Sequence, residues 1–119
     1  MEHKARSLFL SNLVSPRPLV MLGTKSSDGI RNLAPYTSVS IVANSPPLAV
    51  ISLSVDRDNR IRDSLANLRE NGKAVLNFLQ PNQENARLVD QTCKPIPREE
   101  SEWEAFSIES LDSNPLIMK

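Results

Sequence analysis

Short apolar runs, each ended by proline, glycine or asparagine, constrain this chain more than any other feature of its sequence. Residues 18–24 (PLVMLGT), 48–54 (LAVISLS) and 73–79 (KAVLNFL) are brief and apolar, and residues 37–43 (TSVSIVA) alternate hydroxyl and aliphatic side chains. A period of two with valine and isoleucine indicates β-strand. We therefore predict a mainly β protein, with the strand at 48–54 more buried than the one before it.

Turn signals separate these runs. Asp28-Gly29 follows the first run and is typical of a hairpin. Pro46 and Pro47 end the alternating run, because proline cannot donate to a β-ladder. Consecutive strands are thus expected to be antiparallel neighbours.

Two of the segments between or after the strands are predicted to be helical. Residues 63–71 form the first helix, capped by Asp63 or Ser64 and stopped at Gly72. Residues 82–91 (NQENARLVDQ) form a second, weaker helix.

Four or five strands with two short helices favour an antiparallel β-barrel with attached helices. From Lys94 onward the chain is read as irregular and acidic, with Trp103 and Phe106 as anchors on the core. The chain ends in SNPLIMK, an apolar segment where a further strand is expected to begin. Since an unclosed barrel has open strand edges, residues 1–119 are expected to be a single domain whose barrel is incomplete in this chain.

Composition excludes several classes of function. Fourteen lysines and arginines balance fourteen acidic residues, so no net charge favours a nucleic acid or an anionic membrane as partner. One cysteine, Cys93, and one histidine, His3, provide neither a disulfide framework nor a His-based catalytic set or metal site. No run approaches the length of a membrane span and no signal core is present, so a cytoplasmic protein is predicted. We assign no catalytic residue and no metal ligand.

The segment 32–40 (NLAPYTSVS) is the first that could bind a ligand. Asn32 and Pro35 are poor strand residues, and Pro35 is expected to bend the chain so that backbone groups point out of the ladder. Thr37, Ser38 and Ser40 supply hydroxyls beside the bend. A flat heteroaromatic ring with polar edges fits such a surface. A strand with a solvent-facing hydroxyl side and a proline bend explains the same residues without a ligand.

The segment 57–64 (RDNRIRDS) is the second. Three arginines precede a helix start that carries Ser64, and free N–H donors, the helix dipole and arginine charge together suit a phosphate group. The alternative is a solvated loop in which the arginines pair with neighbouring aspartates. The arginines are Arg57, Arg60 and Arg62, and the aspartates are Asp56, Asp58 and Asp63.

Taken in order, these segments resemble the flavin reductase-like family, whose fold is the FMN-binding split barrel. Four features carry the resemblance: RP before the first strand, a G-x-x-N-x-A-P-aromatic turn, S-P-P-L before the third strand, and R-D-S-L-x-N where the family usually has K-D-T-x-x-N. They cover residues 13–79, and residues 80–119 fit more loosely. The family domain is longer, so this chain corresponds to its N-terminal part: a shortened product, a chain completed by a partner's strands, or a fragment.

The resemblance implies an FMN site, NAD(P)H as electron donor, and a homodimer with flavin near the subunit interface. It places the isoalloxazine ring against the strand after the N-x-A-P turn, and the ribityl chain and phosphate at the R-D-S segment and the adjoining strand end. The residues implied for the ring are Asn32, Ala34, Thr37 and Ser38. Those implied for the ribityl chain and phosphate are Ser52, Ser54, Arg62, Asp63 and Ser64, with Arg57 or Arg60 as a further phosphate partner.

Two functions follow from these implications. In the first, the protein is an FMN-dependent oxidoreductase in which NAD(P)H reduces the flavin, and the cofactor carries the chemistry. In the second, it is a non-catalytic FMN-binding protein or a truncated assembly subunit without turnover. A small β-barrel interaction module without cofactor is a third possibility. In each case unpaired strand edges favour a homodimer or larger assembly.

Overall fold

An antiparallel sheet of three strands lies at the centre of the computed structural model, which describes residues 2–14, 16–57 and 60–119. The strand order is β2-β1-β7, with β1 at Val20–Lys25, β2 at Arg31–Tyr36 and β7 at Val75–Phe78. β1 pairs along its whole length with β2 and over four residues with β7. The turn between β1 and β2 includes Gly29 at a φ of 88°, a left-handed conformation that favours glycine. The hairpin predicted at Asp28-Gly29 is confirmed.

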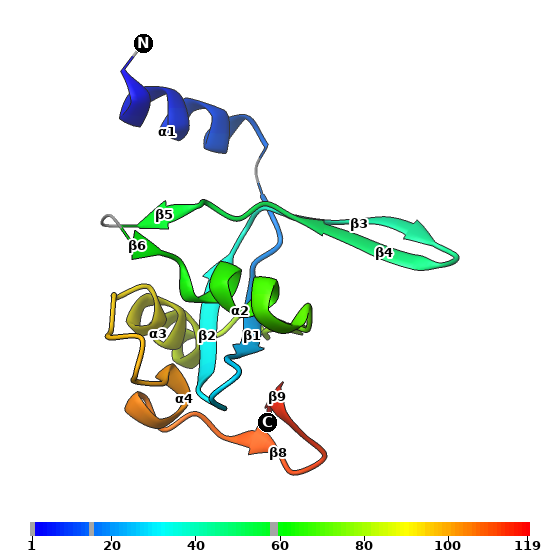
Figure 1. Ribbon diagram of the computed structural model, residues 1–119. Coiled ribbons are helices and arrows are strands. Elements are labelled where there is room, and N and C mark those ends of the chain that lie inside the picture. Colours follow the sequence, from blue (N-terminus) through cyan, green and yellow to red (C-terminus); the bar gives the residue numbers. More distant parts are fainter. Residues whose placement is uncertain (1, 15, 58–59) are drawn as a thin grey trace.

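Three further hairpins and four helices complete the described part of the chain (Figure 1). The hairpins pair β3 (Val39–Asn44) with β4 (Pro47–Ile51), β5 (Asp56–Arg57) with β6 (Arg60–Ile61), and β8 (Ser110–Leu111) with β9 (Asn114–Met118). The helices are α1 (His3–Leu13), α2 (Asp63–Asn71), α3 (Gln83–Thr92) and α4 (Glu102–Ala105). No closed barrel forms among the described residues. The fold is therefore mainly β and antiparallel, with short helices and an open barrel.

The helices predicted from the sequence are found close to their expected bounds. α2 begins at Asp63 and ends where Gly72 takes a left-handed φ of 67°. Its predicted cap is wrong: the N-cap residue is Arg62, without a side-chain capping hydrogen bond, because Asp63 and Ser64 bind other partners. In the described part of the chain, no helix has both the length and the apolar character that a membrane span requires.

Two expectations about the strands are wrong. Pro35 does not interrupt β2 but lies inside it, opposite Met21 of β1. β2 is an edge strand of this sheet, where a residue without an N–H is tolerated. β4 is not more buried than β3, since four of its five residues are exposed. The pattern identified both strands but could not show which of them another layer covers.

Two apolar clusters form the core, one on each face of β1. Alternate residues of a strand point to opposite faces, so β1 contributes to both clusters. The expectation that Trp103 anchors the C-terminal part is confirmed, since this side chain is 1% exposed. The first cluster contains Val20, Leu22 and Tyr36, and the second contains Met21, Leu33 and Trp103.

One side chain attaches β9 to the central sheet. The Nδ2 group of Asn77 on β7 donates to Met21 O at 3.2 Å and to Leu116 O at 3.0 Å. Its Oδ1 accepts from Met118 N at 2.9 Å. The strands approach closely at Gly23, where a Cβ would lie 2.8 Å from Leu116 O. The apolar C-terminal segment is thus a strand, as expected, held by a side-chain amide.

α1 and the β3–β4 hairpin stand clear of the rest of the molecule (Figure 1). α1, which was not predicted, has no buried residue. Large apolar side chains on both elements are more than half exposed. They are Leu8, Phe9, Leu10, Leu13 and Val14 around α1, and Ile41, Val42, Leu48 and Val50 on the hairpin. Together we call these nine residues the apolar surface.

Candidate functional site: a polar cavity at the start of α2

A cavity of about 310 Å³ lies between β2, the start of α2 and the segment that follows α3. Asn32, Ala34 and Tyr36 line it from β2. Residues 94–97 (KPIP), which we call the 94–97 segment, line it from the side of α3, and Glu102 lines it from α4. The cavity is thus built from segments that are widely separated in the sequence.

This cavity brings together residues from both segments that the sequence singled out. The side chains of Asn32 and Ser64 are buried and directly bonded, with Asn32 Nδ2 donating to Ser64 Oγ at 3.0 Å. This bond fixes the start of α2 against the beginning of β2. Six of the eleven predicted site residues line the cavity: Asn32, Ala34, Arg60, Arg62, Asp63 and Ser64.

The remaining five predicted residues lie elsewhere. Thr37, Ser38 and Ser52 line a separate groove of about 630 Å³ beside α1 and the β3–β4 hairpin. There, Ser38 Oγ donates to Ser52 O at 2.8 Å, and Ser52 N donates to Ser38 O at 3.0 Å. Ser54 is exposed and, among the described residues, lines neither space. The side chain of Arg57 lies outside the described part of the chain.

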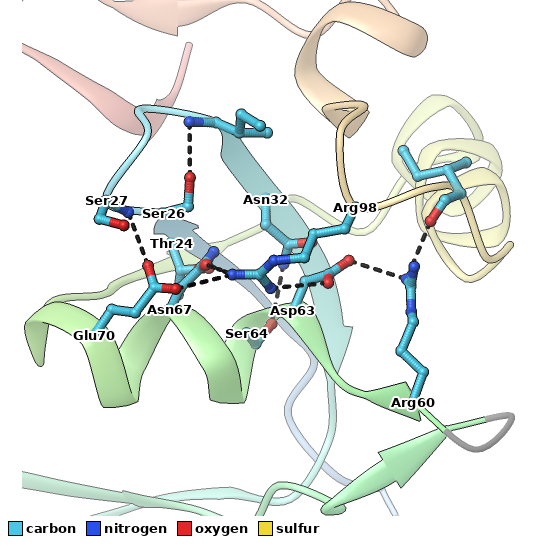
Figure 2. A network of polar contacts seen from close by, with 12 residues as sticks. Thr24, Ser26, Ser27, Asn32, Arg60, Asp63, Ser64, Asn67, Glu70 and Arg98 are labelled. Atoms are coloured by element: carbon cyan, nitrogen blue, oxygen red, sulfur yellow. Dashed lines mark hydrogen bonds and ion pairs between the residues drawn. The ribbon is translucent and has the colours of Figure 1, made fainter.

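The carboxylate of Asp63 holds two arginines (Figure 2). Its Oδ2 accepts from Arg60 Nη2 at 3.2 Å, and its Oδ1 accepts from Arg98 Nη1 at 3.1 Å. The pairing of an arginine with a neighbouring aspartate, weighed from the sequence, is therefore confirmed for Arg60. Asp58 lies outside the described residues. Because both oxygens of Asp63 are engaged, this residue positions side chains around the cavity.

The 94–97 segment is fixed to the rest of the site by these same arginines. Arg60 Nη2 also donates to Ile96 O at 3.1 Å. Arg98 Nη2 donates to Asn67 Oδ1 at 3.3 Å and to Glu70 Oε1 at 3.2 Å, so Arg98 lies along the side of α2 (Figure 2). The segment is therefore tied to β6 at one point and to α2 at its end.

Arg62 and the adjoining helix start present positive charge and hydrogen-bond donors to the cavity. The Nε atom of Arg62 is buried and has no hydrogen-bond partner among the described residues. Arg62 is also the N-cap of α2, where free N–H groups and the helix dipole favour negative charge. A buried donor without a partner is unfavourable, and an oxygen of a bound anion would satisfy it. The residues present thus fit a phosphate group.

Glu102 is the acidic group that faces this positive charge. It is 6% exposed, and its Oε2 accepts from Leu33 N at 3.0 Å. Burial raises the pKa of Glu102, although the bond from Leu33 N opposes the rise. Its negative charge is therefore disfavoured and directed toward the backbone of β2.

The 94–97 segment, Arg98 and Glu102 are parts of the site that were not predicted from the sequence. All three lie in the part of the chain that was read as irregular. Pro95 and Pro97 were a usable signal, since each proline restricts its own backbone and that of the residue before it to extended conformations. An extended segment was therefore predictable at residues 94–97. The contacts made by Arg98 and Glu102 were not predictable.

Solved structures with this architecture define the class of protein as a split barrel. Nitrilotriacetate monooxygenase component B from Bacillus cereus superposes with a TM-score of 0.82 at 26% identity, covering 98% of this chain and 56% of that one. A protein assigned as a flavin reductase with a split barrel domain from Shewanella frigidimarina gives 0.73 at 26% identity, covering 94% and 54%. Both matches extend over nearly the whole chain described here.

The family profile "Flavin reductase like domain" matches residues 13–118, so this chain belongs to the flavin reductase-like family. An uncharacterised protein of Aquifex aeolicus is 34% identical over 92 residues, covering 77% of this chain and 46% of that protein. One of Halalkalibacterium halodurans is 30% identical over 113 residues, covering 95% and 53%. The chain thus spans about half the length of the curated relatives it matches.

Proposed function

We propose that the cavity binds FMN and that the protein is an NAD(P)H-dependent flavoprotein that reduces flavin or transfers electrons. The buried, unpartnered Nε of Arg62 is the observation that carries this proposal, because it marks a place for an anionic oxygen. A cavity of about 310 Å³ is at the small end of the range for cofactor sites. The flavin reductase assignment of one structural neighbour supports the redox function.

Four of the lining residues have a direct role in this proposal. Arg62, Ser64 and the N–H groups at the start of α2 hold the phosphate, and Asn32 and Ala34 contact the polar edge of the ring. When bound, FMN supplies the redox chemistry, and the chain supplies binding and orientation.

The predicted residues outside the cavity also have proposed roles. Thr37 and Ser38 follow Tyr36, which lines the cavity, so they extend the ring surface beyond the end of β2. Ser52 is bonded to Ser38 and belongs to the same surface. Ser54 and Arg57 remain proposed contacts of the ribityl chain and phosphate.

A non-catalytic FMN-binding protein or assembly subunit is the second candidate function. This candidate requires only the anion-binding features of the cavity, namely the buried Nε of Arg62 and the start of α2. Steady oxidation of NADH or NADPH by the FMN-loaded protein would exclude this candidate. A yellow protein that oxidises neither would support it.

Replacing Arg62 and Ser64 together with alanine is expected to weaken FMN binding by about 10- to 100-fold. Hydrogen bonds to charged groups contribute about 1.5–3 kcal/mol, and 1.4 kcal/mol corresponds to a factor of ten. Quenching of FMN fluorescence during titration measures the affinity, and circular dichroism verifies that the variant is folded.

The matched control for this variant is Arg69→Ala, because Arg69 is exposed near the other end of α2. Its affinity for FMN should equal that of the unchanged protein. Unchanged affinity in the double variant would show that the phosphate binds elsewhere. A colourless protein that takes up no added FMN would contradict both candidate functions.

We further propose a homodimer formed through the apolar surface. The apolar surface contains nine large apolar side chains, each more than half exposed, gathered on two projecting elements. Single exposed apolar residues are common on protein surfaces, but a cluster of this size commonly marks an interface. Size-exclusion chromatography with light scattering should give twice the mass of the chain. A monomer that persists as the concentration is raised would refute the dimer.

A further inference from the structure

Three basic side chains line the cavity, and their charges are not equally available. Arg60 is paired with Asp63 and also bonded to Ile96 O. Arg62 and Lys94 have no ion pair with any carboxylate in the described ranges. The positive charge available to a ligand therefore comes from Arg62 and Lys94.

The acidic groups near the cavity are engaged elsewhere. Asp63 is shared by Arg60 and Arg98. Glu102 accepts from Leu33 N, and its burial disfavours the charged form. Within the described part of the chain, neither carboxylate has an ion pair with Lys94.

The backbone holds Lys94 at the edge of the cavity. Lys94 N donates to Gln91 O at 3.1 Å, which attaches it to the end of α3. Two residues later, Ile96 O accepts from Arg60, and Arg98 is bound to α2. The residue itself is exposed, so its long side chain can turn toward an anion without loss of an existing bond.

We propose that Lys94 is a specificity-determining residue, which selects a ligand with a terminal phosphate over the same ligand without it. This inference rests on the proposed function. It adds Lys94 to the residues of the R-D-S segment (62–64) as a further partner of the phosphate. A phosphate monoester carries a charge between about −1.5 and −2 at neutral pH, which Arg62 and Lys94 together balance. An uncharged ligand end offers Arg62 Nε only a neutral acceptor, which makes a weaker hydrogen bond, and it gives Lys94 no ionic partner.

The test compares FMN with riboflavin, which lacks the phosphate, on the full chain and on Lys94→Gln. Fluorescence titration should show FMN binding weakened about tenfold in the variant, with riboflavin binding unchanged. The affinity for FMN should also depend less on salt in the variant than in the unchanged protein. Lys94→Arg should retain the preference for FMN, since the positive charge remains.

Lys73→Gln is the matched control, because Lys73 is an exposed lysine just after the C-terminal end of α2, whereas the cavity lies at the N-terminal end of that helix. It should leave both affinities unchanged. If FMN binds but its advantage over riboflavin is the same in Lys94→Gln, this inference is wrong and the proposed function stands. If the unchanged protein binds neither flavin, both fall.

Discussion

Replacing Trp103 with alanine is expected to lower the free energy of unfolding by about 3–5 kcal/mol. Trp103 is 1% exposed and packs with Met21 and Leu33 in the second core cluster. The guanidinium of Arg31 also lies 4.9 Å from the centre of its ring. Small domains are stable by only about 5–15 kcal/mol, so this variant should be close to unfolding. Urea denaturation followed by circular dichroism measures the effect.

The loss of Trp103 should also release the C-terminal hairpin. Arg31 donates to Ser110 Oγ at 3.1 Å and to Pro115 O at 3.0 Å, and it pairs with Glu104. Without the indole ring to pack on, the guanidinium of Arg31 is less well positioned to donate these hydrogen bonds. Trp103→Phe is the control: it keeps an aromatic face, and the indole Nε1 has no partner among the described residues to lose. Equal stability of the alanine variant and the unchanged protein would show that α4 does not pack on the sheet.

Replacing Glu102 with leucine is expected to lower the free energy of unfolding by about 1–3 kcal/mol, because Leu33 N would be left buried without an acceptor. Glu102→Gln keeps an acceptor oxygen and removes the buried charge. The glutamine variant should therefore be at least as stable as the unchanged protein at neutral pH. The difference in the free energy of unfolding between the leucine and glutamine variants measures the contribution of the hydrogen bond without that of the charge.

The effect of Glu102 on stability should depend on pH in a defined direction. Burial raises its pKa in the folded protein, so the folded state binds this proton more tightly than the unfolded state. The stabilisation from protonation is complete below the unfolded-state pKa and is lost as pH rises through the folded-state pKa. Urea denaturation between about pH 4 and pH 8 measures this effect. The free energy of unfolding of Glu102→Gln should increase relative to that of the unchanged protein as pH rises. A constant difference would contradict this assignment.

The sequence predicted elements whose signals are local. The β1–β2 hairpin and α2 were found because turn residues and a terminal glycine act within a few positions. The exposure of β4 and the place of Pro35 in an edge strand were missed, because both depend on which layers cover a strand. α1 was missed because its apolar residues form only a weak amphipathic pattern.

The site was predictable only in part. The resemblance assigned Asn32 and Ser64 to different parts of one ligand site, and the structure shows a direct bond between them that was not predicted. The engagement of Asp63 with Arg98 was not predictable, because that partner lies 35 positions away in a segment without a regular pattern. FMN, the nicotinamide donor, the homodimer and a cytoplasmic location stay predictions.

The attachment of β9 through Asn77 has a consequence for how this chain tolerates changes in length. The bonds from Asn77 reach Leu116 and Met118, which are 39 and 41 positions away and lie on the same side of β9. A shift of β9 by one residue would turn those groups away, so the amide specifies the register together with the bond from Arg31 to Pro115 O. Insertions or deletions in exposed connections between β7 and β8 can thus be absorbed locally, because the alignment of the C-terminal strand is set by side-chain contacts with β2 and β7 and not by the length of chain before it.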